Sequence, residues 1–154
     1  MMIYHIILYI LYMIIGKITL AIIKPDAVKN GYTGPILIHI MNAGFFIREI
    51  KMKEISKKSA KKFYYEHKKS LFFESLVKFM SSGPIVLIIL EKENAVKDFR
   101  ILIGNTNPIK AKEGTIRNLY GSSLEKNSIH GSDSDKNAFR ECRFYFSDRE
   151  IFLK

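Results

Sequence analysis

Apolar residues along the chain fall into short runs that predict β-strands. Residues 18–23 and 85–90 are almost continuous apolar runs, which are typical of strands buried on both faces. Residues 46–55 partly alternate between apolar and charged side chains and predict a half-exposed strand. Residues 143–146 are mostly aromatic and predict a last strand.

Amphipathic stretches between these runs predict helices. Gly34 opens the first stretch, and Gly44 follows it as a C-cap residue would. Asn94 precedes a later stretch as an N-cap residue, and Gly104 ends it. The predicted helices span residues 34–43, 59–67, 71–80, 94–103 and 133–141. Residues 104–131 show little periodicity, and a connection of that length in a compact domain is usually functional or disordered.

The order of these elements is β-α-β-α-α-β-α-loop-α-β. It predicts an α/β (α+β) fold, a ferredoxin-like sandwich in which helices cover a central antiparallel four-stranded sheet. We expect one domain over residues 17–154, since 154 residues are enough for a single core. Fold alone assigns no function.

Residues 1–16 form an apolar N-terminal extension without a charged side chain. The run is shorter than the roughly 20 residues that span a bilayer. It also lacks the positive start and small-residue cleavage site of a signal peptide. Three interpretations stay open: translation that begins at Met13, a packed or frayed extension, and membrane association, which the physics disfavours.

The chain is basic, with 25 Lys and Arg against 15 Asp and Glu, a net charge of +10. An anionic partner (nucleic acid, a nucleotide or a membrane) would explain this excess. Compositional drift would explain it equally, because lysine is spread over most surface-type segments. Ordinary apolar and charged contents exclude a disordered or collagen-like chain. The single cysteine, Cys142, excludes an internal disulfide and fits a cytoplasmic protein.

Residues that could do chemistry gather in and beside the aperiodic segment. The chain has no P-loop, no dinucleotide-binding glycine motif and no H-E-x-x-H zinc site. A nucleotide enzyme of this sequence must therefore hold phosphate with side chains. Those suited to this task are Arg100, Thr106, Arg117, Asn127 and His130.

Four segments of the sequence resemble motifs of the nucleoside diphosphate kinases. Residues 22–28 (IIKPDAV) are similar to the first-strand signature of that family, and residues 104–108 (GNTNP) and 114–117 (GTIR) to its two loop motifs. Residues 127–134 (NSIHGSDS) are similar to its active-site signature. The resemblance runs in order from about residue 18 to the C-terminus, so we identify the chain as a member of this family.

The resemblance implies transfer of the γ-phosphate of a nucleoside triphosphate, mainly ATP, to nucleoside diphosphates, which maintains NTP and dNTP pools. The implied mechanism is ping-pong, and the histidine that carries the phosphate matches His130. Neutral imidazole is abundant near pH 7 and is a good nucleophile. Gly131 would leave room for the phosphate, a role inferred from size alone. Glu141 would orient the imidazole, and Ser132 would bond near the phosphate and help start the following helix.

The same resemblance implies a set of nucleotide-binding residues. A loose transition state needs fixed positive charge and hydrogen-bond donors around the phosphates. The residues that would surround them are Lys24, Tyr64, Arg100, Thr106 and Arg117. Lys24 and Asn127 would also reach the ribose hydroxyls. Phe72 and Leu76, four residues apart on one helix face, would sandwich the base. Stacking discriminates bases poorly, so we expect broad nucleoside specificity.

The resemblance also implies a cofactor and partners. Mg²⁺ is expected, held mainly by nucleotide phosphates and water, so no protein ligand is assigned. The partners are ATP and other triphosphates, nucleoside diphosphates, and further copies of the chain in a tetramer or hexamer. No obligate nucleic acid partner and no membrane are expected.

Some residues depart from the family pattern. Leu71 replaces the usual proline before the paired aromatics, residues 118–120 replace Gly-Asp-Phe, and Glu125 stands where many members have glycine near the base. These departures bear on base selectivity and subunit contacts. The alternative function is a non-catalytic, basic nucleic-acid-binding protein on a ferredoxin-like scaffold. An RRM would need an aromatic RNP strand, and no such segment is present.

Overall fold

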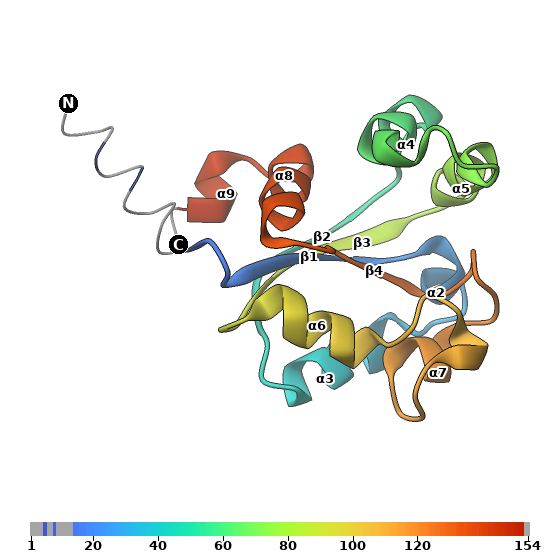
Figure 1. The fold of residues 1–154 in the computed structure, drawn as a ribbon, viewed down its shortest axis with the longest axis horizontal. Helices are drawn as coiled ribbons and strands as arrows, with labels where there is room; N and C mark the ends of the chain where they lie inside the picture. The colour runs from blue at the N-terminus through green and yellow to red at the C-terminus, as the bar shows by residue number, and fades with distance from the viewer. Residues whose placement is uncertain (1–4, 6–7, 9–13, 153–154) are drawn as a thin grey trace.

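A four-stranded antiparallel sheet forms the centre of the molecule (Figure 1). The computed structural model describes residues 5, 8 and 14–152. The expectations for residues 1–16, including a start at Met13, therefore fall mostly outside the described residues. The strands are β1 (Ile18–Ile23), β2 (Phe46–Lys53), β3 (Ile85–Glu91) and β4 (Ile129–Gly131), in the order β2-β3-β1-β4. Every neighbouring pair is antiparallel, which confirms the predicted ferredoxin-like sheet.

Helices cover both faces of this sheet. Figure 1 shows α4, α5 and α8 on one face and α3, α6 and α7 on the other. The α-helices are α2 (Pro25–Lys29), α3 (Thr33–Asn42), α4 (Lys57–Phe63), α5 (Phe73–Met80), α6 (Ala95–Ile103), α7 (Ile116–Tyr120), α8 (Asp135–Tyr145) and α9 (Asp148–Phe152). Two 3₁₀ turns, η1 (Tyr65–His67) and η2 (Pro108–Lys110), lie between them. Among the described residues, no helix has the length and apolarity needed to span a membrane.

Strand β1 is buried on both faces, which explains its nearly continuous apolar run. Leu20 and Ile22 belong to the cluster under α4, α5 and α8. Ala21 and Ile23 belong to the cluster under α3 and α6. Because successive side chains of a strand point to opposite faces, a strand between two helical layers needs apolar residues at every position.

The predicted last strand, residues 143–146, is wrong. Residues 143–145 are the final turn of α8, and the fourth strand is the short β4, inside the segment predicted to lack structure. Four residues of α8 are buried along one face: Ala138, Glu141, Cys142 and Tyr145. Their spacing is helical, and burial of this face outweighs the strand preference of the aromatic residues.

The aperiodic segment is more ordered than its sequence suggests. It contains η2, α7 and β4, each only three to five residues long, which is too short for a periodic signal. Asn94 is the N-cap residue of α6, as predicted, but its backbone is left-handed (φ 56°) and its side chain makes no capping bond. Gly104 does end α6, with φ 83°.

Candidate active site

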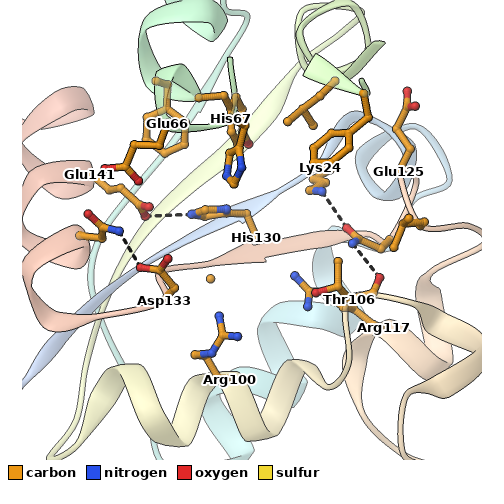
Figure 2. A pocket seen from close by; sticks show the side chains of 18 of the residues that line it. Lys24, Glu66, His67, Arg100, Thr106, Arg117, Glu125, His130, Asp133 and Glu141 are labelled. Atoms are coloured by element: carbon orange, nitrogen blue, oxygen red, sulfur yellow. Dashed lines mark hydrogen bonds and ion pairs between the residues drawn. The ribbon is translucent and has the colours of Figure 1, made fainter. Parts of the chain in front are cut away.

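One cavity of about 710 Å³ collects nearly all the predicted site residues. Figure 2 shows side chains converging on it from β4, α6, α8, the segment around η1 and the residue that follows β1. Those that line it are Lys24, Tyr64, Phe72, Leu76, Arg100, Thr106, Arg117, Asn127, His130 and Glu141. They are far apart in sequence, and the pairing of β1 with β4 brings His130 beside the end of β1, which Lys24 follows.

His130 is held by a carboxylate on the neighbouring helix. It lies in β4 opposite Ile22 of β1, and its Nε2 is 2.8 Å from Oε2 of Glu141 on α8 (Figure 2). An ionised carboxylate only accepts hydrogen bonds, so this contact places the imidazole proton on Nε2. The other nitrogen, Nδ1, then keeps its lone pair. The ring also packs edge-on against Phe63, with 5.7 Å between the ring centroids.

Ser132 lies behind this pair and does not line the cavity. It is fully buried, its hydroxyl donates to Oε2 of Glu141 at 2.7 Å, and its Oγ accepts from the backbone N–H of Leu20. The N-cap of α8 is Ser134, whose side chain accepts from the Asn137 N–H. The predicted role of Ser132 at the helix start is therefore wrong. Its hydroxyl contacts Glu141, and its predicted bond near the phosphate stays a prediction.

The structure gives a packing reason for glycine at position 131. A Cβ added there would lie 2.9 Å from a ring carbon of Phe99 and 3.0 Å from the Cδ1 of Ile103, both on α6. Cβ contacts under 3.0 Å are essentially never seen, so the neighbouring side chains would have to move. The small residue thus lets β4 pack closely on α6. Gly131 also lines the cavity, so the expected room for a phosphate stays a prediction.

Lys24 is a buried cation that the protein holds in place. It is 7% exposed, and its Nζ donates to Oδ1 of Asn127 at 2.7 Å. Asn127 in turn donates from Nδ2 to the Thr106 carbonyl, which ties β1 to the 104–108 loop (Figure 2). Burial, followed by repulsion from Arg117, lowers the pKa of Lys24 to about 8. At neutral pH the buried Lys24 side chain is therefore still mostly charged, and an anionic ligand would stabilise this charge.

Two arginines add further positive charge. Arg117 is buried and donates to the carbonyls of Gly104 and Ile129, and burial, then repulsion from Arg100, lowers its pKa to about 10. Arg100 lies on α6 and is exposed at the cavity, with its guanidinium directed toward the space beneath His130 (Figure 2). A planar guanidinium suits bidentate binding of phosphate oxygens.

Tyr64 offers a hydroxyl that the protein does not use. It is 6% exposed, and its OH has no hydrogen-bond partner within the described residues. Burial raises its pKa well above the usual value, so the group remains an O–H donor. A buried polar group without a partner is costly, and a ligand in the cavity would satisfy it.

The opposite end of the cavity is apolar. Phe72 and Leu76 lie one turn apart at the start of α5, as their spacing predicts, and the Leu76 N–H donates to the Phe72 carbonyl. Leu124, which sequence reasoning missed, also lines the cavity and is 61% exposed. An apolar end and a cationic end beside a nucleophile suit a ligand with an aromatic base and phosphates.

Other lining residues were not predicted as site residues: Phe63, Glu66, His67, Ser123, Glu125, Asp133, Asn137 and Arg140. Asp133 lies within the 127–134 motif, and this neighbourhood was a signal that could have found it. Helical spacing from Glu141 would have indicated Asn137, four residues earlier on α8. Glu125 stands where the family pattern has a residue near the base, which was a further signal. The remainder have no sequence signal, because the packing of α4, η1, α8 and the 121–127 loop brings them to the cavity.

The acidic side chains at the cavity are few and partly occupied. Within the described part of the chain, no three His, Cys, Asp or Glu side chains cluster as a metal site would. Glu141 is occupied by His130 and Ser132. Asp133 remains at the cavity, and a hydrogen bond from Asn137 lowers its pKa and keeps it ionised.

Comparison with known proteins agrees with this geometry. The family model for nucleoside diphosphate kinase matches residues 17–151. A curated nucleoside diphosphate kinase of Flavobacterium psychrophilum is 52% identical over 134 residues, covering 87% of this chain and 96% of that protein. One of Histophilus somni is 46% identical over 136 residues, covering 88% of this chain and 96% of that protein.

Solved structures show the same similarity. The nucleoside diphosphate kinase of Aquifex aeolicus superposes with a TM-score of 0.85 at 42% identity, covering 87% of this chain and 97% of that one. A halophilic nucleoside diphosphate kinase of Halobacterium salinarum, solved in complex with CDP, gives a TM-score of 0.84 at 35% identity, covering 88% and 90% of the two chains.

Proposed function

The chain belongs to the nucleoside diphosphate kinase family, whose members transfer phosphate between nucleotides, and we propose that His130 is the residue through which it does so. The single observation that carries this proposal is the position of His130. Its Nε2 is bonded to buried Glu141, and its ring lines the cavity that also holds Lys24 and Arg100. A neutral nucleophile that faces fixed cations suits attack on a phosphoryl group.

The first half-reaction moves a phosphoryl group to the protein. The Nδ1 lone pair of His130 attacks the γ-phosphorus of a nucleoside triphosphate, mainly ATP, while the bond from that phosphorus to the β,γ-bridging oxygen breaks. The bond electrons leave with the nucleoside diphosphate. Glu141 faces the positive charge that develops on the imidazole ring, since its carboxylate contacts Nε2. The second half-reaction follows the same steps in reverse, and a second nucleoside diphosphate takes the phosphoryl group from Nδ1.

The polarity of the cavity orients the nucleotide. Its phosphates would lie among Lys24, Arg100, Arg117 and Thr106, with the Tyr64 hydroxyl as a further donor. Lys24 and Asn127 would bond the ribose, and Phe72 and Leu76 would contact the base. A loose phosphoryl-transfer transition state gains from fixed cations more than from acid–base chemistry, and hydrogen bonds hold Lys24, Asn127 and Arg117 before the ligand binds. The support is their shared cavity and the Lys24–Asn127–Thr106 chain of hydrogen bonds.

Mg²⁺ is the divalent cation we propose for the bound nucleotide. It would bridge phosphate oxygens and reduce their charge, while it keeps several waters. The residue that would hold it is Asp133, whose carboxylate lines the cavity and is kept ionised by the hydrogen bond from Asn137.

We also propose a homo-oligomer, a tetramer or hexamer, in the cytoplasm. Large apolar side chains are exposed on the outer strand β2, at Phe46 and Met52, and on α3, at Ile38 and Met41. Patches of this kind mark interaction surfaces. Light scattering coupled to size-exclusion chromatography would measure the assembly. The buried free thiol of Cys142 suits a reducing compartment.

A phosphoenzyme assay tests the proposed nucleophile. The protein is incubated with γ-labelled ATP and Mg²⁺, separated from nucleotide, and then treated with CDP. We expect acid-labile label that leaves on CDP addition in the wild type and never forms in His130→Ala. His39→Ala is the matched control, because His39 lies on α3 and does not line the cavity. Equal label in His130→Ala would overturn the proposal.

The alternative function, nucleic-acid binding without catalysis, is not favoured. Relatives that cover most of this chain carry the name of the kinase. The cavity also joins a histidine to cations in a way that a passive binding surface does not require.

A further inference from the structure

The cavity contains four carboxylates, and one of them lies apart from the reacting end. Glu141 contacts His130, Asp133 accepts from Asn137, and Glu66 lies 3.8 Å from Arg140. Glu125 lies beyond Lys24, on the side away from His130 and Glu141 (Figure 2). Its negative charge therefore belongs to the end of the cavity where the apolar residues gather, and not to the phosphate end.

A hydrogen bond fixes the Glu125 carboxylate between the two apolar parts of the cavity wall. Oε2 of Glu125 accepts from the Ser75 hydroxyl at 2.5 Å. Ser75 precedes Leu76 in α5, and Glu125 follows Leu124 in the facing loop. The bond thus joins the helix to the loop at this end of the cavity. Within the described residues no ion pair and no hydrogen bond engages Oε1, so this oxygen is left for a ligand.

We propose that Glu125 is a specificity-determining residue that binds the Watson–Crick edge of the base and makes guanine the preferred base. This inference rests on the proposed function, since it needs a nucleotide with its base against Phe72 and Leu76 and its phosphates toward His130. The base then lies at the end of the cavity that holds Glu125. Apolar contact alone does not distinguish one base from another, whereas a fixed acceptor does.

The donor pattern of the bases decides which one a carboxylate selects. Guanine presents two adjacent donors, N1–H and the N2 amino group, which match the two oxygens of a carboxylate. Adenine and cytosine present one amino donor beside a ring nitrogen acceptor. Uracil and thymine present one N–H between two carbonyl oxygens, which the carboxylate repels. The expected order of acceptors is therefore GDP first, ADP and CDP next, and UDP and dTDP last.

Glu125→Gln isolates this contribution. The phosphoenzyme is prepared with ATP and Mg²⁺ and freed of nucleotide, and its dephosphorylation is followed with GDP or inosine diphosphate, which lacks only the N2 amino group. We expect wild type to prefer GDP over inosine diphosphate by about five- to tenfold in kcat/KM. This is the lower part of the range for a bidentate contact to a base, because this end of the cavity is open to solvent. Glu125→Gln should bring the ratio close to one and should raise the rate with dTDP.

Two further variants separate recognition from structure. Glu54→Gln is the matched control, because Glu54 is exposed and does not line the cavity, and it should keep the wild-type ratio. Ser75→Ala removes the anchor and keeps the carboxylate, so it should reduce the preference for GDP by less than Glu125→Gln does.

The outcomes distinguish this inference from the function on which it rests. If no phosphoenzyme forms in the wild type, the proposed function fails. If the phosphoenzyme forms but GDP and inosine diphosphate react equally, or if Glu125→Gln slows all acceptors by one common factor, the specificity role of Glu125 is overturned and the Ser75 bond is only structural.

Discussion

Oε2 of Glu141 lies 2.8 Å from Nε2 of His130 and also accepts the hydroxyl of Ser132 at 2.7 Å. A single buried carboxylate oxygen thus joins the short strand β4 to helix α8. The contact orients the imidazole, since the ring can no longer rotate without the loss of a charge-assisted bond. It also leaves Nδ1 as the nitrogen with a lone pair for the cavity.

Glu141→Gln should slow phosphoenzyme formation by at least about tenfold. The glutamine amide can present its NH₂ to the ring, which favours the tautomer with the proton on Nδ1, and it no longer stabilises positive charge. Rapid quench with γ-labelled ATP measures this rate. Glu113→Gln, at an exposed position away from the cavity, is the control. An unchanged rate would show that Glu141 does not act through His130.

The activity should fall above the pKa of Lys24, which is about 8 in the nucleotide-free protein. Above that pH the side chain loses its proton and cannot attract an anionic ligand, so kcat/KM should decrease by up to about tenfold per pH unit. The same pKa lies below the ordinary 10.5, so the free energy of unfolding should rise between pH 8 and 10 as the buried charge is lost.

A pH series from 6 to 10 measures both quantities. Lys24→Met should remove the fall in kcat/KM near pH 8, although its activity is lower throughout. A wild-type profile that stays flat to pH 10 would contradict the assignment of Lys24 to substrate binding.

Tyr64→Phe should separate activity from stability. The Tyr64 hydroxyl is buried and has no partner among the described residues, so its removal should not lower the free energy of unfolding and can raise it by about 1 kcal/mol. The activity should nevertheless fall, by about fivefold, because a donor to the ligand is lost. Tyr145→Phe is a close control, since Tyr145 is also a buried tyrosine with an unpartnered hydroxyl but does not line the cavity. Denaturant unfolding and steady-state kinetics of both variants test this prediction. Equal activities of Tyr64→Phe and Tyr145→Phe would refute the role of Tyr64 as a donor to the ligand.

Gly131→Ala should destabilise the protein by about 1–3 kcal/mol, because the added methyl group would meet Phe99 and Ile103 of α6. Gly34→Ala is the opposite case, since Gly34 lies in α3 and a Cβ there meets nothing within 4 Å. That substitution should be neutral or stabilising by up to about 1 kcal/mol, because alanine favours helix. Thermal unfolding of the two variants measures the difference, and a Gly131→Ala protein as stable as wild type would disprove the packing explanation.

The long periodic elements were predictable from the sequence, while the short ones were not. Strands β1 and β3 are nearly continuous apolar runs, and α6 ends at a glycine, so local signals identify them. Strand β4 has three residues, and its pairing with β1, more than a hundred residues earlier, defines it as a strand. Residues 143–146 show the converse, because burial of one face of α8 overrides a local preference for strand.

The sequence by itself determined which residues are available for chemistry. The motifs whose order and spacing point to one family contain His130, Lys24, Arg117 and Asn127. The chemistry of the family requires these side chain types, so they can be read from the sequence without the fold. The tertiary structure decided how they act. It places Ser132 behind Glu141, assigns Nδ1 as the free nitrogen of His130, and brings Glu125 to the apolar end of the cavity. These relationships depend on distances between segments far apart in the chain, and only packing of the sheet against its helices sets such distances.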